Sequence, residues 1–131
     1  MNVRNPDRER RFVDLLISRA GLAPDAVIGV LLPTSKDVRA EGLRVKRLPL
    51  NDDQQKQADS LKLDTNAVWV MGPGREARLR LPIPPGRTWR IGFAYHPGRI
   101  ERRRSVRWSV LARQADRVIG GNTYIIRAPR E

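Results

Sequence analysis

The stretch ARLRLPIPPGRTWRIGFAY, residues 77–95, decides the fold class of this chain. Every second residue on both sides of its central Pro-Pro-Gly run is apolar: Ala77, Leu79, Leu81 and Ile83 before it, and Trp89, Ile91, Phe93 and Tyr95 after it. A period of two with one apolar face is typical of antiparallel strands that bury one side. Pro-Pro-Gly is a turn signal. The stretch therefore predicts two strands joined by a turn.

The same pattern continues on both sides of this stretch. We expect strands over residues 26–32, 43–48, 67–71, 77–83, 89–95, 106–112, 117–119 and 123–127. Gly120-Gly121-Asn122 lies between the last two and predicts a hairpin turn. Short alternating strands with Pro/Gly turns about every eight to twelve residues indicate a sandwich or barrel. We predict a mainly β chain, an antiparallel β-sandwich of jelly-roll-like type with about eight strands.

The N-terminal segment carries a different signal. Asn5 precedes Pro6 and is followed by the carboxylates Asp7 and Glu9, an order that favours the start of a helix. Apolar residues then recur at three-to-four spacing up to Gly21. We expect one amphipathic helix over residues 6–20, packed outside the sandwich. The chain is then a single domain, with an arm and helix at 1–25 and a β body at 26–131.

Between Asn51 and Ser60 the sequence becomes polar and rich in amides. Asp52 and Asp53 are able to cap a short helix from Gln54 to Ala58, and a surface loop fits the same residues equally well.

The charge of the chain is concentrated in its second half. The net charge is +12, and residues 67–131 carry +10 of it, from fourteen arginines against four acidic side chains. Guanidinium groups stay charged and bind carboxylates or phosphates through two parallel hydrogen bonds. A GC-rich genome explains an excess of arginine over lysine, but not its clustering. The pattern indicates a surface that meets an anionic partner.

The candidate partner-binding residues are the arginines of the N-terminal arm and of the densest basic run. They are Arg4, Arg8, Arg11, Arg99, Arg102, Arg103, Arg104 and Arg107. The run at 99–104 fits sequence-independent phosphate contacts, contacts with an acidic protein face, or simply a solvated loop. Outward positions on the strands, Arg78, Arg80, Arg90, Arg107 and Arg113, are expected to line the solvent face of the sheet.

The sequence holds no catalytic motif. Cysteine is absent and His96 is the single histidine, with no motif that joins it to a serine nucleophile. We expect no enzyme activity, no catalytic residue, no metal and no cofactor. The aromatic side chains alternate with aliphatic ones, which favours core filling over the stacking of bases.

These observations favour a non-enzymatic structural or assembly protein. We expect a subunit of a larger particle, such as a virion-like decoration, cement or head–tail accessory protein, by analogy of fold alone. It would form homo-oligomers and dock on acidic protein surfaces. The alternative is a nucleic-acid-binding module whose arginine-rich face contacts phosphates. No apolar run is long enough to span a membrane, and the start has no signal-peptide pattern, so we expect a soluble protein made in the cytoplasm.

Overall fold

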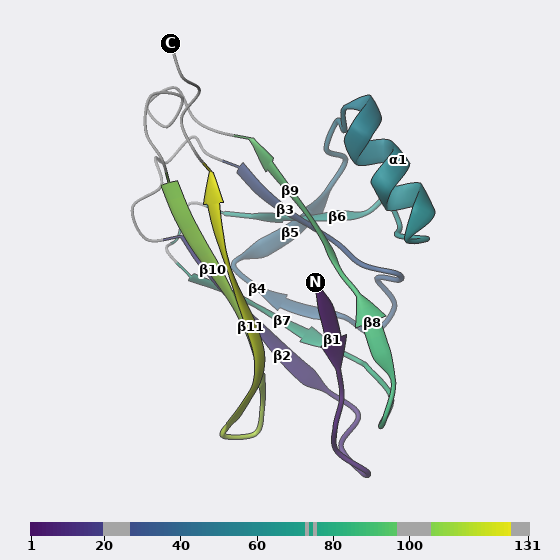
Figure 1. The fold of residues 1–131 in the computed structure, drawn as a ribbon, viewed down its shortest axis with the longest axis vertical. Coiled ribbons are helices and arrows are strands. Elements are labelled where there is room, and N and C mark those ends of the chain that lie inside the picture. The colour runs from purple at the N-terminus through teal and green to yellow at the C-terminus, as the bar shows by residue number, and fades with distance from the viewer. Residues whose placement is uncertain (20–26, 73, 75, 97–105, 127–131) are drawn as a thin grey trace.

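The computed structural model describes residues 1–19, 27–72, 74, 76–96 and 106–126. These residues form eleven strands, all paired antiparallel, and one helix, α1 (Figure 1). Their bounds are β1 (Asn2–Arg4), β2 (Val13–Ser18), β3 (Val27–Leu31), β4 (Arg39–Glu41), β5 (Leu43–Lys46), α1 (Asp52–Ser60), β6 (Val68–Met71), β7 (Glu76–Leu81), β8 (Thr88–Arg90), β9 (Gly92–His96), β10 (Val106–Gln114) and β11 (Arg117–Ile126). The prediction of a mainly β chain is confirmed.

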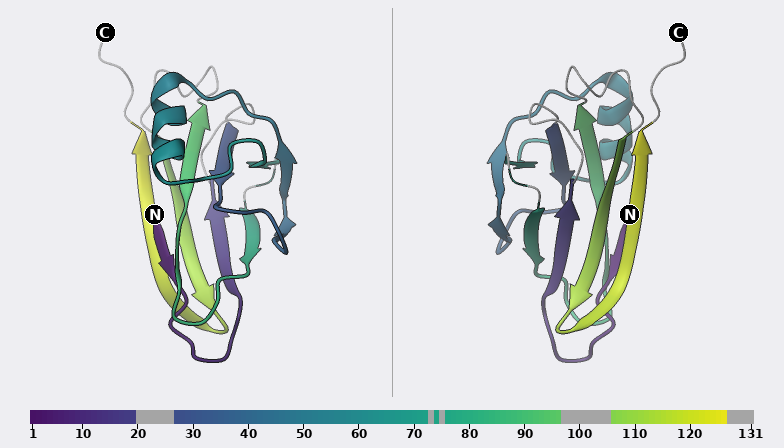
Figure 2. Two further views of the ribbon diagram at one scale, coloured as in Figure 1. Left: turned by 90° about the vertical axis from the view of Figure 1, so that its right-hand side faces the viewer. Right: turned by 90° about the vertical axis from the view of Figure 1, so that its left-hand side faces the viewer.

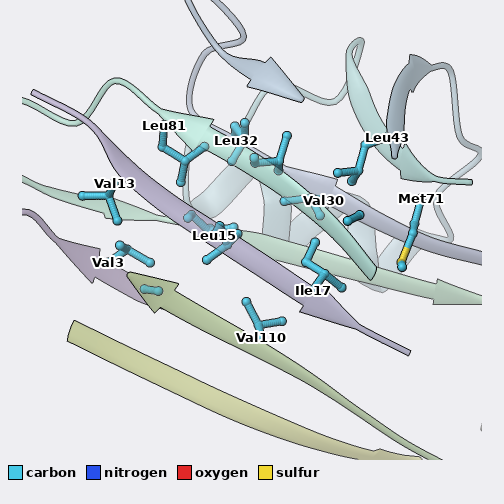
Figure 3. Close-up of a cluster of buried hydrophobic side chains, with 14 of the residues drawn as sticks. Val3, Val13, Leu15, Ile17, Val30, Leu32, Leu43, Met71, Leu81 and Val110 are labelled. Atoms are coloured by element: carbon cyan, nitrogen blue, oxygen red, sulfur yellow. The ribbon is translucent and has the colours of Figure 1, made fainter. Parts of the chain in front are cut away.

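The strands form three open sheets. The largest has the order β11-β10-β2-β7-β4, the second β5-β6-β3-β9, and the smallest pairs β1 with β8. One hydrophobic cluster combines side chains of the two large sheets, among them Leu15 and Ile17 of β2 with Val30 of β3 and Met71 of β6 (Figure 3). The main core therefore lies between these sheets. Burial of this apolar surface is the chief source of stability in a domain of this size.

A second, smaller cluster covers the other face of the four-stranded sheet. There Ala58 of α1 and Leu63 pack with Val68 and Ala94 of β6 and β9. Helix α1 begins at a capping box, in which the Asn51 side chain accepts from Gln54 N and the Gln54 side chain accepts from Asn51 N. Asn51 is thus the cap, and the helix is longer than the expected 54–58. Figures 1 and 2 show α1 toward one end of the molecule and the tip of the β10–β11 hairpin toward the other.

The predicted N-terminal helix is wrong. Residues 13–18 form β2, which lies between β10 and β7 in the five-stranded sheet, and residues 2–4 form β1. Val13, Leu15 and Ile17 are buried while their neighbours are half-buried, which is a period of two. Phe12, which a helical stripe would bury, is 48% exposed. An isolated helix of this length is marginal in water, whereas β2 is hydrogen-bonded on both sides. The N-terminal segment is therefore part of the sheets and not an arm outside them.

The predicted hairpin at Gly120-Gly121-Asn122 is also wrong. These residues continue β11, opposite Ala112, Leu111 and Val110 of β10. The chain reverses at Ala115 and Asp116 instead, where Ala115 has φ 53, between the paired Gln114 and Arg117. A Cβ on Gly121 would lie 3.3 Å from a methyl carbon of Leu111. Glycine here makes room for that side chain and does not mark a turn.

The other predicted strands are present with small shifts of their ends. Strand β7 shows the expected alternation, with Ala77, Leu79 and Leu81 buried and the residues between them exposed. The strand expected at 89–95 is interrupted at the fully buried Ile91, which separates β8 from β9. No helix of the described residues is long and apolar enough to cross a membrane.

Two adjacent leucines of β2 test its assignment as a strand. Leu15 is fully buried and Leu16 is half-buried on the outer face, although a helix would place both on one stripe. We expect Leu15→Ala to lower the free energy of unfolding by about 2–5 kcal/mol and Leu16→Ala by less than about 1.5 kcal/mol. Urea denaturation of both variants measures the difference. Equal losses would contradict the strand.

Candidate partner-binding surface

A groove lies at the end of the five-stranded sheet, where three loops meet. Its volume is about 950 Å³. Its walls come from the β1–β2 loop, the β3–β4 loop with the start of β4, and the β7–β8 loop: Arg8, Glu9, Arg11, Phe12, Asp37, Val38, Arg39, Pro82, Pro84 and Pro85. We call it the loop groove. Two of the predicted site residues, Arg8 and Arg11, line it.

The loop groove combines an apolar surface with cationic groups. The exposed Phe12 ring and three proline rings provide the apolar surface. Arg8, Arg11 and Arg39 are exposed, and none of them forms an ion pair with another described residue. Glu9 and Asp37 also line the groove, so its charge is mixed with a cationic excess. Aromatic side chains and arginine are the residue types that protein–protein interfaces favour.

Arg80 of β7 supports Phe12 from one side. Its guanidinium carbon lies 5.9 Å from the centre of the Phe12 ring, which is within the range of a cation–π contact. Its Nε also donates to Asp14 Oδ1 at 3.2 Å. Arg80 thus lies beside the Phe12 ring and is itself bound to β2 through Asp14.

A buried amide fixes the loop that carries Arg8, Arg11 and Phe12. Asn5 is fully buried, and its Nδ2 donates to the carbonyl oxygens of Arg10 (2.6 Å) and Ile83 (2.8 Å). Its Oδ1 accepts from Gln114 Nε2 (2.6 Å) and from Asp7 N (3.0 Å). Every donor and acceptor of this side chain is therefore used, which is the condition under which a buried polar group stabilises a fold.

A second local turn shapes the same loop. Asp7 Oδ1 accepts from the backbone N–H groups of Glu9 (2.8 Å) and Arg10 (3.0 Å). The hydrogen bond from Arg10, and after it that from Glu9, holds the pKa of the Asp7 carboxyl below its ordinary value. Because that pKa is lowered, the turn contributes its stability above the pKa of an unfolded aspartate. The contribution is lost as the pH falls through the lowered value. At neutral pH these hydrogen bonds hold the backbone of the loop that carries Arg8 and Arg11.

A second cationic surface lies on the two-stranded sheet. In the register of β1 and β8, Val3 is paired with Trp89 and faces inward, while Asn2, Arg4, Thr88 and Arg90 are exposed on the other side. Arg87, just before β8, is exposed as well. We call this surface the ribbon face. It holds the third predicted site residue of the N-terminal segment, Arg4.

The outer face of the five-stranded sheet is less cationic than the sequence predicts. Arg78 forms an ion pair with Glu41 and Arg80 with Asp14, each at 3.2 Å. Arg113 is half-buried and stands opposite Asp14 in the register. Arg90 belongs to the ribbon face and not to this sheet. Carboxylates from strands that are distant in sequence therefore pair with two of the five arginines of the expected stripe.

The predicted site residues do not form one cluster. Arg107 is exposed on β10, six residues from Arg113, which puts it about 20 Å along the strand from the row that contains Asp14. Arg99, Arg102, Arg103 and Arg104 lie outside the described residues. Sequence reasoning missed Phe12, Arg39 and the three prolines as parts of one site. The pairing of β4 with β7 brings Arg39 close to the prolines, and no local sequence pattern predicts that pairing.

The structure also places the single histidine of the sequence. His96 ends β9, opposite Val27. Within the described ranges, no three His, Cys, Asp or Glu side chains are close enough to hold a metal ion together. No family model, no curated protein and no solved structure matches the chain.

Removal of the Asn5 side chain tests whether it fixes the groove loop. We expect Asn5→Ala to lower the free energy of unfolding by about 2–4 kcal/mol, because Gln114 and two carbonyl groups each lose a buried partner. Asn2→Ala is the matched control: Asn2 is exposed on β1, and its loss should cost less than about 0.5 kcal/mol. Urea denaturation measures both. If the two variants are equally stable, Asn5 does not carry this role.

Proposed function

We propose that the protein is a non-enzymatic assembly subunit that docks on an acidic protein surface through the loop groove. The observation that carries the proposal is the combination of unpaired Arg8, Arg11 and Arg39 with the exposed Phe12 ring and the proline rings. An apolar centre provides the burial that protein association requires, and arginines around it orient a carboxylate-bearing partner. The hydrogen bonds of Asn5 and Asp7 hold the backbone of the β1–β2 loop before binding, which reduces the entropy lost on association.

The proposed setting is a larger particle of repeated subunits, such as a virion-like decoration, cement or head–tail accessory protein. A small β body of jelly-roll-like sandwich type suits this role, and the open antiparallel sheets on one shared core are consistent with it. In this proposal the protein is soluble, is made in the cytoplasm and self-associates within the particle. The run at 99–104 and Arg107 remain proposed contacts for a second acidic neighbour.

The alternative function, a nucleic-acid-binding module, is not favoured by the loop groove itself. The groove is lined by the exposed Phe12 ring and three proline rings, and apolar rings contribute little to contacts with a phosphate backbone. An acidic protein segment with an apolar side chain complements this mixture better.

A photoreactive phenylalanine analogue at position 12 tests the proposal directly. It should crosslink, inside the source cells, to a protein, either another copy or a different subunit. The triple variant Arg8→Glu, Arg11→Glu and Arg39→Glu should reduce the yield about tenfold or more, since reversed charges repel an acidic partner. Mass spectrometry of the crosslinked product identifies the partner and the acidic side chains near the crosslink.

The matched control reverses three exposed cations at and just after β5, with Arg44→Glu, Lys46→Glu and Arg47→Glu. It changes the net charge by the same amount and should leave the yield nearly unchanged. The proposal fails if no protein is crosslinked, or if both triple variants reduce the yield equally.

A further inference from the structure

The ribbon face differs in its chemistry from the loop groove. Its outward side chains, Asn2, Arg4, Thr88 and Arg90, and the adjacent Arg87 are all able to donate hydrogen bonds. None of the residues in β1, in β8 or in the turn before β8 is acidic. Arg4, Arg87 and Arg90 form no ion pair with any described residue. The face therefore offers three uncompensated charges.

No large apolar side chain projects from this face. Val3 is 2% exposed, and both Val3 and its partner Trp89 pack on the main core. A protein interface needs an apolar centre, which this face lacks. The phosphate backbone of a nucleic acid needs only charge and hydrogen-bond donors, because such contacts carry no sequence information.

The register sets the spacing of the two strand arginines. Arg4 stands opposite Thr88 and Asn2 opposite Arg90, so Arg4 and Arg90 are diagonal neighbours on one face. Diagonal neighbours of this kind are about 7–8 Å apart, and their Cβ atoms are somewhat closer. Two guanidinium groups at this distance can each bind a different phosphate of one nucleic-acid strand.

The backbone under the face is fixed at both ends. Asn5 N donates to Arg87 O (2.9 Å) and Gly86 N to Asn5 O (2.8 Å) at one end, and Ile91 N donates to Met1 O (2.8 Å) at the other. Gly86 has φ +73, a conformation that lets the chain turn directly into Arg87. The arginines thus project from a rigid support, and only their own side chains lose freedom on binding.

We infer that the ribbon face is a sequence-independent binding site for the phosphodiester backbone of nucleic acid, contacted by Arg4, Arg87 and Arg90. This site is separate from the loop groove and does not depend on its proposed role. Its affinity comes from the release of counterions and falls as salt rises.

The test is the binding of a fluorescently labelled oligothymidylate to the full chain at several KCl concentrations, followed by anisotropy. Each phosphate of a single strand that the protein neutralises makes the slope of log K against log salt steeper by about 0.7. The variant Arg4→Ala, Arg87→Ala, Arg90→Ala should therefore show a slope shallower than that of the wild type by about 2, and each single variant one shallower by about 0.7. All three side chains are exposed, so thermal unfolding should be nearly unchanged.

The matched control is Arg44→Ala, Arg47→Ala, Arg117→Ala, which removes the same charge from exposed sites outside the ribbon face. It should leave the slope close to that of the wild type, as should the loop-groove triple variant. The inference is overturned if the wild type does not bind, or if the control and ribbon variants lose the same slope. It is also overturned if polyglutamate of similar length binds the ribbon face as tightly as the oligothymidylate, which would make the face a site for acidic polypeptide.

Discussion

The buried amide of Asn5 holds together the parts of the structure on which both candidate surfaces depend. Its side chain joins the β1–β2 loop to Ile83 before β8 and to Gln114 at the end of β10, and its backbone pairs with Gly86 and Arg87. These segments are far apart in sequence, so no local preference positions them. Arg4 lies on one side of Asn5 in the chain and Arg8 on the other. A single side chain with all its hydrogen bonds made therefore joins the segment that carries the ribbon face to the loop that lines the groove.

The sequence correctly predicted those strands in which the pattern of apolar residues fits the two-residue period of a strand and not the period of a helix. In β7, apolar residues alternate with arginines, and no helical stripe accommodates that order. In the N-terminal segment, the run Phe12-Val13-Asp14-Leu15-Leu16-Ile17 fits both the period of a strand and that of a helix. The helix-capping pattern at Asn5 and Asp7 favoured the helix, and that prediction was wrong. Those side chains do accept backbone hydrogen bonds, but from a turn. The segment forms a strand because it pairs with β10 and β7, and this pairing with distant residues cannot be read from the local sequence.

The candidate surfaces were predictable only in part for the same reason. Arg4, Arg8 and Arg11 were selected for their charge, and the structure places all three at the surface. Their separation into two surfaces follows from the pairing of β1 with β8, a contact between residues more than eighty positions apart. Arg39 and the prolines 82, 84 and 85 join the groove through the pairing of β4 with β7. The composition of the sequence was enough to select arginines as candidate binding residues. Only the strand register showed which residues lie beside each of them.

The position of the carboxylates, more than the number of arginines, distinguishes the three arginine-bearing surfaces. On the outer face of the five-stranded sheet, Arg78 and Arg80 already have Glu41 and Asp14 as partners. Exposed pairs of this kind contribute at most about 1 kcal/mol to stability, but they remove the field that an approaching anion would feel. The loop groove retains two carboxylates beside three unpaired arginines and an apolar surface, which suits an acidic protein. The ribbon face carries arginines with Asn2 and Thr88 and no carboxylate, which is the composition behind the proposed phosphate contacts. One arginine-rich chain thus presents, in its described part, three surfaces with three different arrangements of charge. The two that we propose as binding sites are those whose arginines form no ion pair with a described residue.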